Sequence, residues 1–337
     1  MTLVVPAADR LVDSKGRVAK KLRISVTDRC NFACLFCMPD KSKVKWLPEA
    51  DQLTFDEVEK TARMLSGLGI DGIRITGGEP LLRRNLEALV ARLSRIDGVD
   101  TLDMTTNGWF LKQRAHLLKD SGLQGVTVSL HSLKRDRFSK ISGVDALPRV
   151  LEGIEEALRV GLDPVKVNSV ALRGYNDDEI VDLVDYAHSR GLSIRFIEFM
   201  PLDGLGVWSP DAVMAGKDII AALKSSYDLR PMGREMGKTA SLWSIGSDRG
   251  RLGLITPMSD PFCDDCDRIR LTSDGMLLSC LFDTQYYDLK PFLRGGSDAE
   301  LARFMKGVVS KKPEGVGHMP WIKGGWEKPR NMNAVGG

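Results

Sequence analysis

Alternating apolar and polar residues mark six short stretches of the chain as β-strands. In the first of them, Leu22 and Ile24 alternate with Arg23, so that one face is apolar and the other polar. The six predicted strands are Leu22–Thr27, Gly72–Thr76, Thr101–Thr106, Val126–Ser132, Val165–Ala171 and Ser193–Met200. Each is expected to bury one face in an apolar core and to present the other to a polar space.

Longer stretches with helical character separate these strands. They are Phe55–Leu68, Asn85–Ile96, Phe110–Asp120, Val150–Val160 and Asp178–Ser189. Four glycines, Gly69, Gly122, Gly161 and Gly191, stand where helices should end. Strands that alternate with helices in this way predict βα units and a parallel sheet.

The polar strand faces decide between two parallel architectures. An open doubly wound sheet is covered on both sides, so its strands should be apolar on both faces. Strands with one polar face instead predict an α/β fold of the incomplete (β/α)6 barrel type, with a hydrophilic lumen. By analogy with eight-stranded barrels, we expect the site at the carboxyl ends of the strands.

The pattern changes from about Thr239. Ala240–Gly246 and Arg251–Pro257 predict an antiparallel hairpin, and a Gly- and Pro-rich tail follows further on. We therefore predict a barrel domain over residues 1–238 and a C-terminal extension over residues 239–337.

Charge and composition exclude few classes of protein. The 337 residues include 48 Lys or Arg and 45 Asp or Glu, a formal net charge of +3, which does not indicate diffuse binding to nucleic acid or membranes. No apolar run is long enough to span a bilayer, and Asp9 and Arg10 interrupt the apolar N-terminus before a signal peptide could form. We expect a cytoplasmic protein.

All six cysteines fall into two groups of three, namely Cys30, Cys34 and Cys37, and then Cys263, Cys266 and Cys280. In a reducing cytosol, such grouping favours metal ligation over disulfides.

The first group has the spacing C-x3-C-x2-C. A structural zinc site needs four ligands, and the nearest histidine in sequence is His116, so zinc would require a distant fourth ligand. Three thiolates on a four-iron cubane leave one iron open, in contrast to the usual ligation by four cysteines. An open iron can bind the amino and carboxylate groups of S-adenosylmethionine.

A glycine-rich turn, Gly77-Gly78-Glu79-Pro80, follows the second predicted strand. Together with the cysteine spacing, it resembles the radical S-adenosylmethionine superfamily, whose glycine-rich turn holds the methionine end of the cofactor. The resemblance implies a partial (β/α)6 barrel, which agrees with the strand pattern.

The second group, Cys263-x2-Cys266-x13-Cys280, is followed by basic residues in Arg268-Ile269-Arg270. A zinc ribbon is the alternative, but it needs a fourth ligand, and His318 is the only histidine downstream. Cations beside the cysteines suit an anionic ligand, which favours a second cluster with an open iron that faces substrate.

Nearly the whole chain, from Leu22 to Gly337, resembles the GTP 3′,8-cyclases, the first enzymes of molybdenum cofactor biosynthesis. The motifs that carry the resemblance are Leu22–Cys30, Phe36–Pro39, Arg74–Pro80, Thr105–Gly108, Cys266–Leu271 and the terminal Gly336–Gly337.

The resemblance implies two 4Fe-4S clusters, on the first and on the second cysteine group, and S-adenosylmethionine contacts by Phe36 (through its backbone), Gly78, Ser129 and Met200. The implied GTP contacts are Arg23, Arg74, Thr105, Lys166, Arg195, Arg268, Ile269 and Arg270, and the implied catalytic residues are Arg268, Arg270, Gly336 and Gly337.

It also implies the reaction and the partners. A radical formed from S-adenosylmethionine would take hydrogen from the ribose C3′ of GTP, and C3′ would attack C8 of guanine. The product would be (8S)-3′,8-cyclo-7,8-dihydroguanosine 5′-triphosphate. Implied partners are an electron donor such as flavodoxin or ferredoxin, a downstream cyclic pyranopterin monophosphate synthase and a possible homodimer, with no membrane and no nucleic acid.

The strand pattern supports a phosphorylated substrate independently. Arg23, Arg74 and Lys166 stand on the polar, inward faces of their strands. Burying several cations together is costly unless anions pair with them, and a triphosphate would supply those anions.

Three positions depart from the family pattern. Gly72 stands where a lysine is common, Phe36 where tyrosine is common, and His131 where aspartate is frequent. The segment Gly233–Thr239 ends like a phosphate-binding P-loop, but Met232 replaces its first glycine and a strand is expected afterwards.

Two other functions fit the sequence less well. A peptide-modifying radical enzyme usually has more cluster cysteines and would not need inward arginines. A zinc-bearing nucleic-acid module built on the second cysteine group would predict a strongly basic face or an aromatic stacking strip. This region instead contains Asp260, Asp264, Asp265 and Asp267.

Overall fold

The computed structural model describes residues 10–203, 206–246, 248–319 and 330–336. Its described strands form one twelve-stranded sheet in the order β12-β11-β10-β1-β2-β3-β4-β5-β6-β9-β8-β7. The strands are β1 Lys21–Ser25, β2 Gly72–Thr76, β3 Thr101–Thr106, β4 Gly125–Ser129, β5 Val165–Ala171, β6 Ser193–Glu198, β7 Leu229–Gly233, β8 Ser241–Ile245, β9 Asp248–Ile255, β10 Arg268–Leu271, β11 Met276–Leu278 and β12 Tyr287–Asp288.

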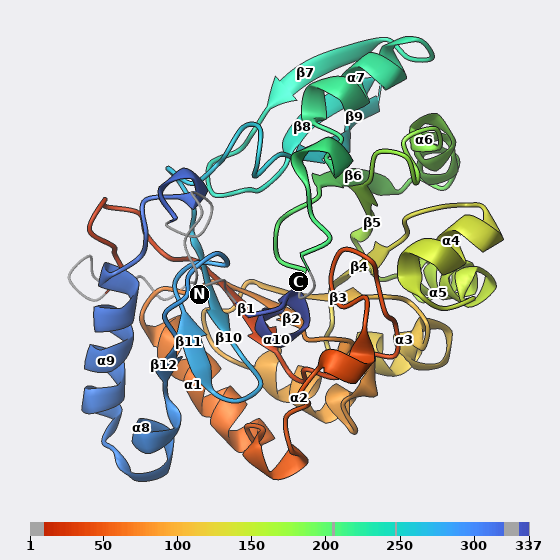
Figure 1. Ribbon diagram of the computed structural model, residues 1–337. Coiled ribbons are helices and arrows are strands. Elements are labelled where there is room, and N and C mark those ends of the chain that lie inside the picture. The colour runs from red at the N-terminus through yellow and green to blue at the C-terminus, as the bar shows by residue number, and fades with distance from the viewer. Residues whose placement is uncertain (1–9, 204–205, 247, 320–329, 337) are drawn as a thin grey trace.

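Helices cover the outer side of this curved sheet (Figure 1). They are α1 Phe55–Gly67, α2 Leu86–Leu93, α3 Leu111–Asp120, α4 Arg135–Ser142, α5 Leu147–Arg159, α6 Ile180–Ser189, α7 Gly216–Lys224, α8 Lys290–Gly295 and α9 Asp298–Ser310. The short helix α10 Met332–Val335 lies on the inner side instead (Figure 1). In the described part of the chain, none of these helices is long and apolar enough to cross a membrane.

Strands β1 to β6 are parallel neighbours in chain order, which confirms the predicted (β/α)6 barrel. All six predicted strands are present, and three of them, β2, β3 and β5, have the predicted bounds. The four predicted helix-ending glycines, Gly69, Gly122, Gly161 and Gly191, all have positive φ, a conformation that costs glycine little.

The apolar strand faces form the core between sheet and helices. Leu22 and Ile75 are fully buried there and belong to the same cluster as Leu65 of α1. Helix α1 begins with a capping box, in which Thr54 and Glu57 each accept a hydrogen bond from the other's backbone N–H group. The polar faces of the strands are thereby turned inward, to the lumen.

The C-terminal region extends the barrel sheet on both sides. Strand β9 pairs parallel with β6, and β10 pairs parallel with β1, so that eight neighbouring strands are parallel. The predicted hairpin is present as β8 and β9, while β10 was not predicted. The short β10 has only four residues, too few for a strand pattern to be recognised before its pairing partner is known.

Residues 332–336 lie inside the barrel (Figure 1). Helix α10 is at its centre (Figure 1), and Gly336 follows with a φ of 79°. A side chain at 336 would collide with the hydroxyl of Thr76 in β2. Gly336 is therefore packed against the inner side of the strands.

Two helical glycines offer a matched test of the packing. A Cβ at Gly153 of α5 would lie 2.7 Å from the carbonyl oxygen of Gly108, whereas one at Gly307 of α9 would meet nothing within 4 Å. We expect Gly153→Ala to lower the free energy of unfolding by about 1–3 kcal/mol through overpacking. Gly307→Ala should raise it by about 0.5–1 kcal/mol through helix propensity. Denaturant unfolding of both variants measures this difference, and equal effects would contradict the close packing.

Candidate functional site

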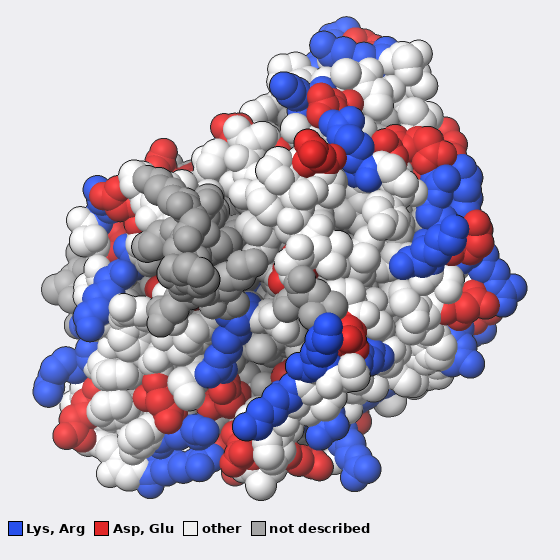
Figure 2. Space-filling model, in the orientation of Figure 1, with Lys and Arg blue, Asp and Glu red and all other residues white. Residues whose placement is uncertain are grey.

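A cavity of about 560 Å³ lies inside the barrel. Eight Lys or Arg residues line it, against three Asp or Glu, although the whole chain has a net charge of only +3. On the outer face seen in Figure 2, residues of both signs are interspersed. The excess positive charge is therefore concentrated in the cavity, on Lys21, Arg23, Arg74, Lys166, Arg195, Lys238, Arg268 and Arg270.

Of these cations, Arg23 of β1 has the least negative charge near it. No residue in the described part of the chain forms a hydrogen bond or ion pair with its guanidinium group. Burial lowers the pKa of Arg23 well below its ordinary value, and the nearby charges of Arg270, Arg74 and Arg268 lower it further. Such a group lacks an anion.

Arg74 of β2 has a partner in the lumen. Its Nη2 donates to Asp103 Oδ2 at 2.6 Å, and its Nη1 donates to the Thr127 hydroxyl at 3.0 Å and, more weakly, to that of Thr105 at 3.4 Å. Burial still lowers the pKa of Arg74. The guanidinium is thus held in place by three strands.

Lys166 and Arg195 extend the positive surface across β5 and β6. Burial lowers the pKa of Lys166 to about 8, and the charges of Arg195 and Arg74 contribute. Burial also lowers the pKa of Arg195 to about 10. Gly253 pairs with Arg195 in the sheet, and a Cβ there would lie 3.1 Å from Arg195 Cγ, so the glycine makes room for the arginine.

Arg268 and Arg270 project from β10. Arg270 donates to the carbonyl oxygens of Val335 and Gly336, and so fixes the end of the chain inside the lumen. Burial lowers its pKa to about 10. Arg268 packs over the Phe262 ring at 5.1 Å, and its buried Nη1 has no hydrogen-bond partner in the described structure. That nitrogen is free to bind a ligand.

The first cysteine trio lies on the loop after β1. Ala33 and Leu35 donate backbone hydrogen bonds to Ser142 and Ile141 at the end of α4, which anchor the loop. Burial raises the pKa of Cys30 to about 11 and that of Cys37 to about 12. Thiolates there need a cation, such as a bound metal cluster.

The glycine-rich turn is locked to this loop. A Cβ at Gly78 would collide with the carbonyl oxygens of Asp28 and Arg29, and the Gly78 N–H donates to Thr27 O at 2.7 Å. The close approach that this glycine permits is therefore between two protein backbones.

Glu79 of the same turn joins β2 to the end of β3. Its side chain is 1% exposed and accepts from the Thr106 hydroxyl, the Asn107 N–H (both 2.7 Å) and the Leu81 N–H (3.0 Å). Burial raises its pKa to about 7. Asn107 in turn donates to Asn31 Oδ1, at 2.8 Å, on the cysteine loop. Glu79 thus positions the loop indirectly.

The second trio lines the cavity, with Cys263 and Cys266 before β10 and Cys280 after β11. Burial acts to raise the pKa of Cys266, but the charges of Arg268 and Lys312 outweigh it and lower that pKa to about 7. Burial raises the pKa of Cys280 to about 11.

Two buried cations organise this second trio. Arg17 donates to the carbonyl oxygens of Cys263, at 2.8 Å, and of three residues at 312–314. Lys312 donates to the carbonyls of Cys266 and Arg268, at 2.7 and 2.9 Å. Gly315 allows its loop to approach Cys263, because a Cβ there would lie 3.1 Å from the Cys263 sulfur.

The donor set fits two iron–sulfur clusters. The thiols of each trio are near enough to influence one another's pKa, and no disulfide joins the six cysteines. Among the described residues, no three His, Cys, Asp or Glu side chains are arranged to hold a single metal ion. Each trio brings soft sulfur ligands, which iron–sulfur clusters require.

The structure brings most of the expected nucleotide contacts together. The cavity is lined by Arg23, Arg74, Thr105, Lys166, Arg195, Arg268, Arg270 and, from the expected S-adenosylmethionine contacts, Met200. The Ile269 side chain is instead fully buried in the core, so a contact there would use its backbone. Phe36, Gly78 and Ser129 lie outside the cavity lining, and Gly337 lies outside the described residues.

The structure explains the departure at His131. The Val170 N–H donates to His131 Nδ1 at 3.1 Å, and burial lowers the pKa of His131 to about 4. The neutral imidazole therefore supplies a hydrogen-bond acceptor, which an aspartate side chain could supply as well. The Phe36 ring packs edge-on against it, at 4.7 Å.

The lining residues that sequence reasoning missed include Lys21, Asp103, Gln124 and Lys238. Asp103 and Lys21 belong to strands whose alternation, carried through every residue, would have placed them inward. Lys238 comes from the segment that resembles a P-loop. The strand β8 follows that segment, as expected, so it is not a P-loop.

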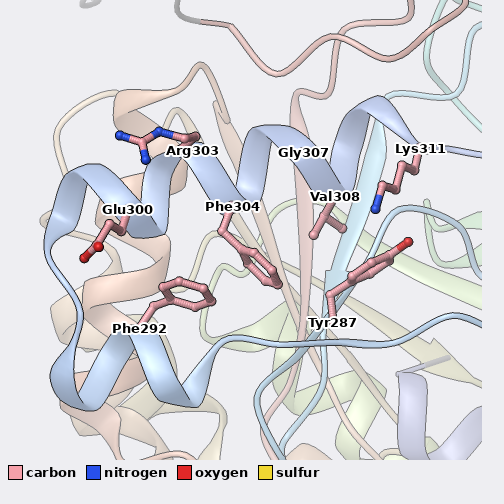
Figure 3. Close-up of a pocket in the computed structure, with 8 residues that line it drawn as sticks. All are labelled: Tyr287, Phe292, Glu300, Arg303, Phe304, Gly307, Val308 and Lys311. Atoms are coloured by element: carbon pink, nitrogen blue, oxygen red, sulfur yellow. The ribbon is translucent and has the colours of Figure 1, made fainter.

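A separate groove of about 420 Å³ lies between α8, α9 and β12 (Figure 3). The rings of Phe292 and Phe304 pack against each other there, with centroids 4.5 Å apart, and Lys311 Nζ lies 5.4 Å from the centroid of the Tyr287 ring. None of the predicted site residues lines this groove.

Comparison with known proteins finds two matching family models. The model of the Radical SAM superfamily matches residues 24–187, and that of Molybdenum Cofactor Synthesis C matches residues 192–318. Solved structures of SuiB from Streptococcus suis share the fold at 14–16% identity. The one bound to the precursor peptide SuiA has a TM-score of 0.64 and covers 94% of this chain and 76% of that chain. Fold and cysteine loop thus define a radical S-adenosylmethionine protein.

Curated relatives identify the family within this superfamily. The GTP 3′,8-cyclase of Syntrophomonas wolfei is 40% identical over 97% of this chain and 100% of its own length. That of Moorella thermoacetica is 42% identical over 96% and 99%. The chain belongs to the GTP 3′,8-cyclase family.

Glu79 provides a stability test of the site's framework. In Glu79→Gln, an NH₂ group replaces one of the two carboxylate oxygens, and both of these oxygens now accept hydrogen bonds. The NH₂ group would therefore face another donor, and at least one buried hydrogen bond would be lost. We expect the free energy of unfolding to fall by about 1–3 kcal/mol. Thermal unfolding of anaerobically purified protein measures this. The exposed Glu152→Gln is the matched control and should change little; an equal effect of both would show that the buried bonds are unimportant.

Proposed function

We propose that the cavity binds GTP and that the protein converts it to (8S)-3′,8-cyclo-7,8-dihydroguanosine 5′-triphosphate, the first step of molybdenum cofactor biosynthesis. The observation that carries the proposal is the set of inward cations without enough acidic partners, with Arg23 the least compensated. A triphosphate supplies that missing negative charge, and guanidinium groups match phosphate oxygens in geometry. The names of the relatives support the same substrate.

The cofactors of the family are S-adenosylmethionine and two 4Fe-4S clusters. We assign the first cluster to Cys30, Cys34 and Cys37, and the second to Cys263, Cys266 and Cys280. Phe36, Gly78, Ser129 and Met200 are the proposed S-adenosylmethionine contacts. When bound, these cofactors supply the radical chemistry that removes hydrogen from the ribose C3′, so that C3′ bonds to C8 of guanine.

The chain's own residues hold the substrate in register. Arg23, Arg74, Lys166 and Arg195, with the Thr105 hydroxyl, would bind the triphosphate. Fixing two reacting atoms in this way can contribute on the order of 7–11 kcal/mol to barrier reduction.

The proposed catalytic residues are Arg268, Arg270, Gly336 and Gly337, and the two arginines stand on β10, next to β1. Arg268, with its free Nη1, Arg270 and the Ile269 backbone would contact the nucleotide, while Arg270 holds Gly336 in the lumen.

The partners and the division of the chain are part of this proposal. The reaction needs a one-electron donor such as flavodoxin or ferredoxin, and a cyclic pyranopterin monophosphate synthase would consume the product. We propose a cytoplasmic enzyme, with the barrel domain in residues 1–238 and the second cluster in residues 239–337. A homodimer stays a prediction.

Anaerobic turnover tests the function. Reconstituted protein should contain about eight irons per chain, as two cubanes require. With dithionite, S-adenosylmethionine and GTP, it should form 5′-deoxyadenosine and the cyclised nucleotide in equal amounts, which mass spectrometry detects. Arg268→Ala should slow GTP conversion by at least about tenfold, the effect of losing one charged hydrogen bond, while S-adenosylmethionine still binds. Formation of 5′-deoxyadenosine without GTP consumption would refute the assignment.

Lys166 predicts a pH dependence of nucleotide binding. Its pKa in the free protein is about 8, so it loses its charge as the pH rises from 7 to 9. Arg195, Arg74, Asp103 and Lys238 surround it, and the two arginines keep their charges over this range. GTP affinity, measured by calorimetry without reductant, should therefore fall across this window.

Lys166→Arg is the matched variant for this prediction, because arginine remains charged at pH 9. Its GTP affinity should be nearly constant between pH 7 and 9. If wild type and variant show the same pH profile, another group is responsible.

A further inference from the structure

Lys21 occupies an unusual place at the amino end of the barrel. It is the first residue of β1 and the direct register partner of Gly72, the first residue of β2. A Cβ at Gly72 would lie 2.6 Å from Lys21 Cδ, from Lys21 Nζ and from the Thr101 hydroxyl. The lysine side chain therefore lies across the glycine, toward β3, in space that any other residue at 72 would fill.

The register of the sheet places this lysine in a layer of the lumen. Lys21 pairs with Arg268 on one side and with Gly72 on the other, while two residues further along Arg23 pairs with Arg270 and Arg74. Alternate residues of a strand share a face and are about 6.6 Å apart. Lys21 thus forms the next layer of cations below Arg23, and both line the cavity.

The local charge leaves Lys21 available to a ligand. Its Nζ pairs with Asp71 Oδ1 at 2.6 Å, but both side chains are about one-third exposed, 32% and 33%. An ion pair that water reaches contributes little, so a more highly charged phosphate can replace the carboxylate. Asp71 lies just before β2 and is not among the residues that line the cavity.

We propose that Lys21 is a phosphate-binding residue of the nucleotide site, which exchanges Asp71 for the terminal phosphate when a nucleoside triphosphate binds. Gly72 serves to let the lysine cross from β1 to this position. The inference rests on the proposed function, since it deepens the same site. It adds a contact that selects for the length of the phosphate chain.

Binding of GTP, GDP and guanosine to the anaerobic holoenzyme, without reductant, tests the proposal by calorimetry. Lys21→Ala should weaken GTP binding about five- to tenfold, the effect of losing one partly exposed charged contact. Guanosine affinity should not change, and GDP should lose less than GTP. Lys20 is exposed and directly precedes β1, so Lys20→Ala is the matched control. This variant should bind GTP, GDP and guanosine like wild type.

Gly72→Ala provides an independent variant that keeps the charge. Its Cβ must displace the lysine, so GTP binding should weaken to a similar extent, and the double variant should lose little more than Lys21→Ala alone. GTP affinity unchanged in Lys21→Ala, or an equal loss for guanosine, would overturn the inference while leaving the proposed function intact. Wild-type protein that does not bind GTP would overturn both.

Discussion

The barrel lumen holds far more cations than anions, and the rest of the structure depends on how this excess of positive charge is compensated. Apolar residues on the outer strand faces build the core, so the alternate residues must point inward, and on β1, β2, β5 and β6 these are Arg23, Arg74, Lys166 and Arg195. Positive charges that face one another without enough counter-charge raise the free energy of the folded protein. An anionic ligand removes that cost, so the same arrangement that weakens the empty barrel provides binding energy for a triphosphate.

Small residues and the end of the chain make this arrangement sterically possible. Gly253 lets Arg195 lie flat against β9, and Gly72 does the same for Lys21 on β2. Gly336 fits beside Thr76 only because it has no side chain, which brings its carbonyl oxygen to Arg270. The terminal segment thus contributes neutral oxygen acceptors where a side-chain carboxylate would compete with the substrate for the arginines.

The sequence predicted the parts of this molecule that depend on local pattern or short spacing. Six strands, five helices and four helix-ending glycines follow from alternation, length and backbone freedom within one element. It could not predict that β10 joins β1, because four residues carry no distinctive pattern and their pairing spans more than 240 residues of chain. The contact between Asp103 and Arg74 could not be predicted for the same reason. A lone aspartate on a strand does not indicate that it holds Arg74, since that contact exists only once β2 and β3 are paired.

Chain topology also determines how far apart the two cysteine trios lie. The first follows the carboxyl end of β1, whereas Cys263 and Cys266 precede the amino end of β10, and these two strands are parallel neighbours. Strand β11 runs antiparallel to β10 and so returns Cys280 to the same end as its partners. The trios are therefore separated by about one strand length, on the order of 15 Å for five residues. A ligand that acts at one cluster while it is held near the other must be extended along the lumen. The layers of Arg23 and Lys21, with Arg270 and Arg268 beside them, would then fix its position along that axis.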